Sequence, residues 1–191
     1  MNQQEFLASL VGLDTLKVWP VDKKYAEAPD VEKVMIWTIE NRQRHSSLRG
    51  AKIKPMFQET LGKSGSNVIL GRASVQPELQ RVLQPDVEFV LLVSWRLWRL
   101  MSPSRKLMLI DHELCHMMKK ENRPSSVPHD LEEFSAIFEE YGRDEVLAFH
   151  NLSRLLFQQK DSDILEAMNL LERGGVPFDI VDGKIVFGKQ T

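Results

Sequence analysis

Residues 109–116 read Leu109-Ile110-Asp111-His112-Glu113-Leu114-Cys115-His116. His112 and His116 are four residues apart, so in a helix their imidazoles lie on one face, one turn apart. Two neutral imidazoles in this arrangement can bind one zinc ion. Glu113 lies about 100° further around the helix axis. A zinc ion lowers the pKa of a bound water to about 7. From its position on the helix, the Glu113 carboxylate can accept a proton from that water and pass it to a leaving amine.

The segment around this motif is predicted to be one long helix. Ser102 followed by Pro103 is typical of a helix start. The helix is expected to run to Lys120 and to end before Pro124, which places the two histidines in mid-helix. Residues 122–128 are then a loop. The alternative to metal binding is a helix whose two histidines are solvated or hydrogen-bonded in the core.

A catalytic zinc ion needs a third protein ligand and keeps its fourth position for water. Asn122 stands where a metzincin-type motif has its third histidine, which disfavours that class. The candidates downstream are His129, Glu132 and Glu133. His129 is favoured because it follows a loop long enough to turn the chain back. Glu132 and Glu133 remain alternatives, although Glu133 also has the spacing of a capping-box partner of Asp130.

The rest of the chain predicts an α+β fold: a small, partly antiparallel sheet packed on the motif helix, with helical additions and a C-terminal hairpin. Pro55 interrupts one extended segment, which is therefore predicted to be an edge strand or a strand with a break. Asp30 is predicted to cap a helix. The expected strands are 51–57, 68–75 and 88–94, with a hairpin over 178–187 around Asp182-Gly183; the expected helices are 5–11, 30 onward, 77–83, 130–141 with Gly142 as a stop, 145–159 and 162–173.

The motif residues, followed by His129-Asp130-Leu131-Glu132-Glu133-Phe134, resemble the phage metallopeptidase family and, more distantly, SprT-like zinc peptidases. The resemblance implies a zincin-like fold, Zn²⁺ ligands at His112, His116 and His129, and Glu113 as the catalytic acid and base. It covers about residues 50–142. One domain, 1–191, is expected, with a core at 50–142, a helical extension at 1–49 and a helical and hairpin addition at 143–191.

The length, the net charge and the cysteine count indicate which classes of protein are disfavoured for this chain. A length of 191 residues allows a core without disulfides, and the single cysteine, Cys115, excludes an intrachain disulfide. The net charge of −2 gives no global attraction for nucleic acid or an anionic membrane. Met1–Leu13 does not resemble a signal peptide, and the longest apolar run, Phe89–Val93, is too short to span a bilayer. A cytoplasmic protein without a membrane partner is expected.

Several other residues have two interpretations. Cys115 is expected to be a packed thiol rather than a fourth ligand. Asp111 and Asp130 either orient a ligand imidazole or are a surface acid and a helix cap. Tyr141 and His150 either stabilise an oxyanion or are structural, with the structural role favoured. His45 is expected to be exposed.

A basic stretch precedes the motif: Arg42, Arg44, Arg49, Lys52 and Lys54. A solvated surface is favoured over contacts with phosphates, because no nucleic-acid motif accompanies it. Trp95 and Trp98 are expected to pack in the core rather than to stack on bases.

The function that these residues predict is zinc-dependent hydrolysis of a peptide or protein substrate. Two alternatives remain open. One is a non-catalytic zinc-binding interaction module, such as a phage factor acting on a host protein. The other is a nucleic-acid-associated SprT-like factor.

Overall fold

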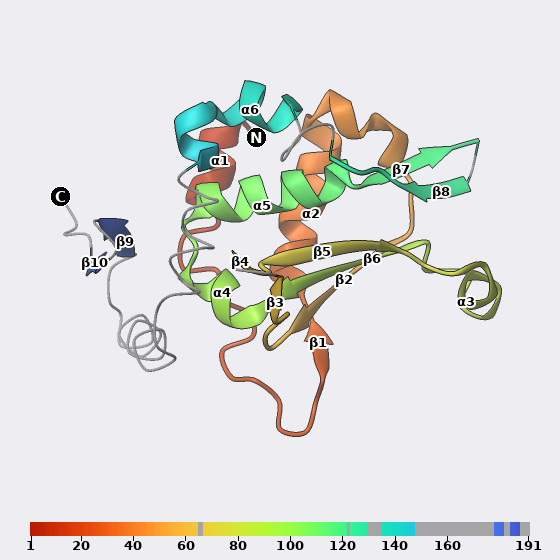
Figure 1. Cartoon of the computed structure of the whole chain (residues 1–191), viewed down its shortest axis with the longest axis horizontal. Coiled ribbons are helices and arrows are strands. Elements are labelled where there is room, and N and C mark those ends of the chain that lie inside the picture. Colours follow the sequence, from red (N-terminus) through yellow and green to blue (C-terminus); the bar gives the residue numbers. More distant parts are fainter. Residues whose placement is uncertain (65–66, 122, 130–134, 148–177, 182–183, 188–191) are drawn as a thin grey trace.

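A computed structural model of the chain describes residues 1–64, 67–121, 123–129, 135–147, 178–181 and 184–187. The fold is α+β (Figure 1), as the sequence predicts. Its main sheet has four strands in the order β1-β2-β6-β5. The bounds are Tyr25–Glu27 for β1, Ile53–Gln58 for β2, Phe89–Ser94 for β6 and Gly71–Val75 for β5. The central pair, β2 and β6, is parallel, and both outer pairs are antiparallel.

Pro55 lies in β2, which is an interior strand, so the edge-strand prediction is wrong. The carbonyl of Lys52 accepts a hydrogen bond from the amide of Phe89, so the backbone groups of Lys52 face β6. The backbone groups of successive residues in a strand point to opposite sides, and Pro55 is three residues further along. The nitrogen of Pro55 therefore faces β1. The pairing with β1 reaches only from Gln58 to Met56, so the missing N–H falls just beyond its end.

Two long helices form the layer next to the sheet. They are α2 (Pro29–Asn41) and α5 (Pro103–Cys115), which pack against each other and contact β2 and β5 respectively. Side chains at helical spacing on α5 are fully buried, and alternate residues of β6 meet the same core. These core residues include Val31, Val34, Phe89, Leu91, Val93, Leu107, Ile110 and Leu114. The core thus fixes the face of α5 that points toward the sheet.

The start of α2 differs from the prediction. Ala28 is the N-cap and Pro29 occupies the first helical position, so Asp30 is not the cap. Asp30 is buried instead, and its carboxylate accepts hydrogen bonds from the backbone amide and the hydroxyl of Thr15. A residue that can cap a helix therefore ties the preceding loop to the helix.

The motif helix is shorter than predicted. Ser102 caps α5 and Pro103 begins it, as expected, but α5 ends at Cys115 and His116 is its C-cap. Residues 117–120 are not helical, and the loop predicted at 122–128 is largely a strand. They form an antiparallel hairpin of β7 (Met117–Lys120) and β8 (Arg123–Ser126), which Figure 1 shows extending beyond the end of α5. The motif is thus at the end of its helix.

Smaller elements complete the described chain. The helices α1 (Gln3–Ala8), α3 (Glu78–Leu83) and α6 (Ser135–Tyr141) lie near their predicted positions, and Gly142 follows α6 with φ +81°. The 3-10 helix η1 (Gln43–Leu48) follows α2, and α4 (Trp95–Leu100) follows β6 and buries both of its tryptophans, as predicted. A small pairing joins β3 (Lys63–Ser64) to β4 (Asn67–Val68), and the C-terminal hairpin joins β9 (Phe178–Val181) to β10 (Lys184–Phe187).

The predicted helices at 145–159 and 162–173 lie almost entirely outside the described residues. The domain boundaries at 49 and 142 stay predictions. Within the residues that the structure describes, no helix is long and apolar enough to cross a membrane.

Candidate metal centre

Three imidazoles converge where α5 ends. His112 and His116 come from the last turn of α5, and His129 comes from the segment after β8. One nitrogen from each ring lies within 4.8 Å of the others. The Nε2 atoms of His112 and His129 are 3.4 Å apart. The structure therefore brings together the three histidines that the sequence singles out.

The β7–β8 hairpin returns the chain to the helix end. The backbone amide of Val127 donates to the carbonyl of His116 at 2.9 Å. Nδ1 of His116 lies 2.9 Å from the carbonyl oxygen of Val127. A carbonyl only accepts, so Nδ1 carries the proton and Nε2 presents the lone pair. Val127 thus orients one of the three imidazole rings and holds the chain two residues before His129, a role that the sequence does not indicate.

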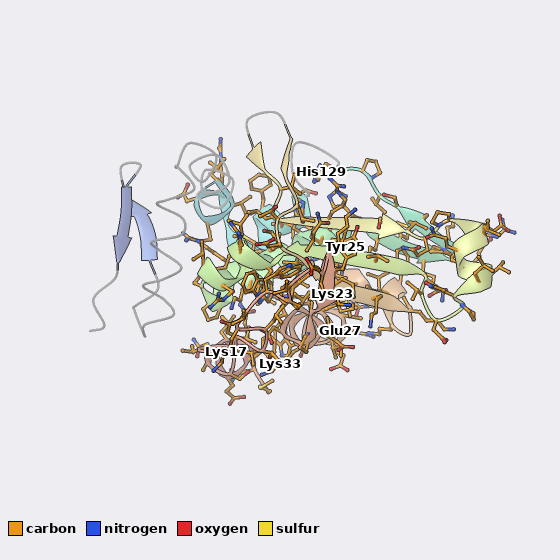
Figure 2. All side chains as sticks on the ribbon, turned by 90° about the horizontal axis from the view of Figure 1, so that it is seen from below. Lys17, Lys23, Tyr25, Glu27, Lys33 and His129 are labelled. Carbon is orange, nitrogen blue, oxygen red and sulfur yellow. The ribbon has the colours of Figure 1, made fainter. Side chains whose placement is uncertain are left out.

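The donor set fits a zinc ion. Nitrogens bound to zinc at 2.0–2.1 Å in tetrahedral geometry lie about 3.3–3.4 Å from each other. The Nε2 atoms of His112 and His129 have this separation. Two of the three histidines are half-buried and the third, His129, is exposed, so the site opens to the surface. Figure 2 shows His129 at one margin of the molecule, away from Lys17 and Lys33 at the opposite margin.

Glu113 follows His112 on α5 and is 5% exposed. Its position on the last turn places it beside the histidine face rather than on it. A carboxylate beside this face and largely shielded from bulk water suits proton transfer.

Asp111 precedes His112 and is fully buried. Arg44 donates to both of its oxygens, from Nε at 3.0 Å and from Nη2 at 2.5 Å. Nε2 of His45 lies 2.6 Å from Oδ1, and the hydroxyl of Tyr141 donates to Oδ2 at 2.8 Å. The carboxylate therefore joins α5 to η1 and to α6. We call these four residues the Asp111 cluster.

The Asp111 cluster corrects three predictions. Asp111 is not a surface acid. His45 is 2% exposed, so the expectation that it is exposed is wrong. Arg44 is half-buried and bound to Asp111 rather than solvated. The structural interpretation favoured for Tyr141 agrees with its bond to Asp111. These contacts join residues 30 to 67 positions apart, and local sequence patterns carry no signal for such pairs.

The charges in this cluster shift the ionisation of its members. Burial alone would raise the pKa of Asp111, but the hydrogen bonds from His45 and Arg44 hold it well below its usual range. Burial and the adjacent Asp111 carboxylate raise the pKa of Tyr141. Burial opposes the charge of Arg44, yet the bond to Asp111 leaves its pKa raised. Asp111 and Arg44 are thus a charged pair, and Tyr141 remains a neutral donor.

A second possible ligand group combines His45, Asp111 and Cys115, with donor atoms within 4.8 Å of one another. Both oxygens of Asp111 already accept from the charged Arg44. A cation there would face that guanidinium, so this group suits a metal less well than the three histidines. Cys115 is half-buried against the core, in agreement with the expectation of a packed thiol.

The other members of the basic stretch also have partners within the chain. Arg42 pairs with Glu140 and donates to Gln3. Lys52 pairs with Asp86 and Lys54 with Glu27, at exposed positions. Arg49 reaches the carbonyl of Glu40 at 3.4 Å. The interpretation of the whole stretch as solvated surface is therefore wrong at its Arg42–Arg44 end.

The alternative ligands Glu132 and Glu133, together with Asp130 and His150, lie outside the described residues.

Comparison with known proteins identifies the family. The model of the family described as "Putative phage metallopeptidase" matches residues 23–158. This match is wider than the 50–142 region of the motif resemblance and includes α2 and η1; η1 carries Arg44 and His45 of the Asp111 cluster. Neither the curated proteins nor the solved structures provide a match to the chain. The family match covers more than half of the sequence, and the chain therefore belongs to the phage metallopeptidase family.

Proposed function

We propose that this chain is a zinc-dependent peptidase, with His112, His116 and His129 as the metal ligands and Glu113 as the general base and acid. The observation that carries the proposal is the convergence of three imidazole nitrogens at the end of α5. The family description supports metallopeptidase chemistry at the coarse level. The choice of zinc rests on the donor set, since three imidazoles and an open position are typical of catalytic zinc.

The protein's own residues have distinct tasks in this proposal. A zinc ion held by the three histidines would polarise a substrate carbonyl and lower the pKa of a water to about 7. Glu113 accepts the proton of the attacking water and delivers it to the amine of the departing peptide. Val127 keeps Nδ1 of His116 protonated, so that Nε2 is the ligand atom. The exposed position of His129 suits access by a peptide or protein substrate.

Metal content tests the ligand assignment. The purified chain is stripped with a chelator, dialysed against Zn²⁺ and assayed by elemental analysis. We expect one zinc per chain in the wild type and a large loss of affinity in His129→Ala. His45→Ala tests the second possible ligand group, because it removes an imidazole of that group; it should keep one zinc if the three histidines hold the ion. Full zinc affinity in His129→Ala would overturn the ligand assignment.

Replacing Glu113 with glutamine separates catalysis from binding. Glutamine keeps the size of the side chain but cannot accept the proton. We expect Glu113→Gln to retain one zinc and to cleave fluorescence-quenched casein at least about 100-fold more slowly. Equal cleavage by wild type and variant refutes the role of Glu113. A wild-type chain that binds zinc and cleaves no casein or mixed peptide library favours the non-catalytic interaction module.

A further inference from the structure

Gly71 is the first residue of β5 and pairs with Val93 of β6. The side chain of Glu113 packs directly against it. A Cβ atom added at Gly71 would lie 2.7 Å from Oε1 of Glu113 and 2.9 Å from both Cδ and Cγ. The three nearest atoms all belong to Glu113, and each lies closer than ordinary van der Waals contact allows.

The backbone conformation does not explain this glycine. The glycines with positive φ in the described chain are Gly12, Gly50, Gly62 and Gly142, and Gly71 is not among them. Any residue can adopt the backbone of Gly71, so glycine is needed there for space alone. The space is filled by the side chain of Glu113.

An added methyl could not be accommodated by a small adjustment. Cγ of Glu113 is as close as Cδ, so rotating the terminal carboxylate alone leaves a clash. Relief needs rotation about Cα–Cβ or Cβ–Cγ, which moves the carboxylate to a different place. The strand cannot easily retreat, because Gly71 is paired with Val93 and the carbonyl of Leu70 accepts from Ser94 at 2.9 Å.

We propose that Gly71 is a positioning residue for Glu113: the bare backbone of β5 forms the wall against which the carboxylate of the general base rests. This inference rests on the proposed function, because it assigns Glu113 a task that depends on its location. The sheet then sets the position of the proton-transfer group, while α5 and the β7–β8 hairpin set the positions of the imidazoles.

The test begins with Gly71→Ala. We expect this variant to keep one zinc per chain and to lose at least about tenfold in kcat on casein, because the carboxylate is displaced and the ligands are not. Ser74→Thr is the matched control, since it also adds one methyl to β5, but on the opposite face of the strand. It is expected to retain wild-type kcat.

Thermal unfolding of the chelator-treated protein provides a readout without activity. Overpacking should lower the Tm of Gly71→Ala by roughly 3 °C or more. Glu113→Ala removes Cγ, Cδ and Oε1, the three atoms near the added methyl. In a Glu113→Ala background, Gly71→Ala should therefore lower Tm by much less. An equal loss of Tm in both backgrounds would show that the methyl does not act through Glu113 and would overturn the inference.

The visible spectrum of the Co²⁺-substituted protein separates this inference from the proposed function. If Gly71→Ala displaces the carboxylate from the metal, it should shift the absorption bands in the direction that Glu113→Gln shifts them. A wild-type protein that cleaves neither casein nor peptides refutes the peptidase proposal, and the spectra still decide the placement of Glu113. Unchanged spectra in Gly71→Ala, or an unchanged kcat with active wild type, overturn the role of Gly71.

Discussion

Replacing Asp111 with asparagine removes one negative charge and keeps the size of the side chain. In the wild type the fully buried carboxylate accepts from Arg44 on both oxygens, lies 2.6 Å from His45 and accepts from Tyr141. An asparagine amide replaces one of the two carboxylate oxygens with an NH₂ group, whose N–H donors then face the donors of Arg44 or Tyr141. The half-buried guanidinium of Arg44 then loses its nearest counter-charge and keeps only Glu140, whose Oε2 lies 3.6 Å from Nη1.

The size of the effect follows from this burial. Breaking a buried ion pair by removing one partner costs about 3–5 kcal/mol, and the lower end of this range applies because Arg44 is half-buried and keeps Glu140. Domains of this kind have a free energy of unfolding of about 5–15 kcal/mol, so the loss is a large part of the total. With a urea m-value of about 2–3 kcal/mol per molar, the midpoint of unfolding should fall by about 1–2 M. Tyr141→Phe removes one hydrogen bond to a charged group and should cost less, about 1.5–3 kcal/mol.

Urea unfolding of the chelator-treated protein, followed by tryptophan fluorescence, measures the effect apart from metal binding. Asp86→Asn is the matched control: Asp86 is 93% exposed and lies 3.4 Å from Lys52. An exposed pair contributes at most about 1 kcal/mol, so this control should shift the midpoint little. If Asp111→Asn unfolds at the same urea concentration as Asp86→Asn, the claim that the Asp111 cluster ties η1 and α6 to α5 is refuted.

Three further predictions concern Val127, Glu88 and Gly142. Val127→Pro removes the amide that donates to the carbonyl of His116 and so loosens the return of the chain toward His129; zinc affinity in a fluorescent-chelator competition should fall about 10–100-fold, and unchanged affinity contradicts the claim that this bond holds the returning chain in place. Burial opposes ionisation of Glu88, but bonds from Lys119 and the Lys52 amide hold its pKa below the usual value, so its stabilising effect is present at neutral pH and is lost as the pH falls through that lowered pKa. The difference in urea midpoint between wild type and Glu88→Gln should therefore shrink from pH 7 to pH 3, and a constant difference contradicts this linkage. Gly142 has φ +81°, and among the described residues no atom lies within 4 Å of a Cβ added there, so Gly142→Ala should cost about 1 kcal/mol in urea unfolding from backbone strain alone; an unchanged midpoint is the contrary result.

The convergence of the three histidines was predictable because its geometry is mainly local. His112 and His116 need only helical spacing. This spacing is kept although α5 ends at Cys115, because His116 still has a helical conformation, with φ −72° and ψ −7°. His129 needs only a return of the chain over twelve residues. The α+β class and the buried strand β6 were likewise indicated by local hydrophobic patterns.

The errors lie where distant partners override local preferences. Residues 117–120, Met-Met-Lys-Lys, are good helix formers, yet they pair with residues 123–126 as a hairpin. His45 and Arg44 sit in a stretch of charged residues, and their burial depends on Asp111, more than 60 positions away. Pro55 is tolerated in an interior strand because β1 is short. The position of Gly71 against Glu113 likewise depends on how β5 meets α5, which no sequence spacing encodes.

The β7–β8 hairpin is fastened at its base, where Val127 and His116 exchange two hydrogen bonds. Its tip lies at Glu121, and the four paired positions of β7 and β8 separate this tip from those two hydrogen bonds. Extra residues inserted at the tip would lengthen the ribbon outward and leave the third imidazole where it is. The fold therefore has a place where related chains can differ in length, and so acquire new surfaces, without disturbing the arrangement of the three imidazoles.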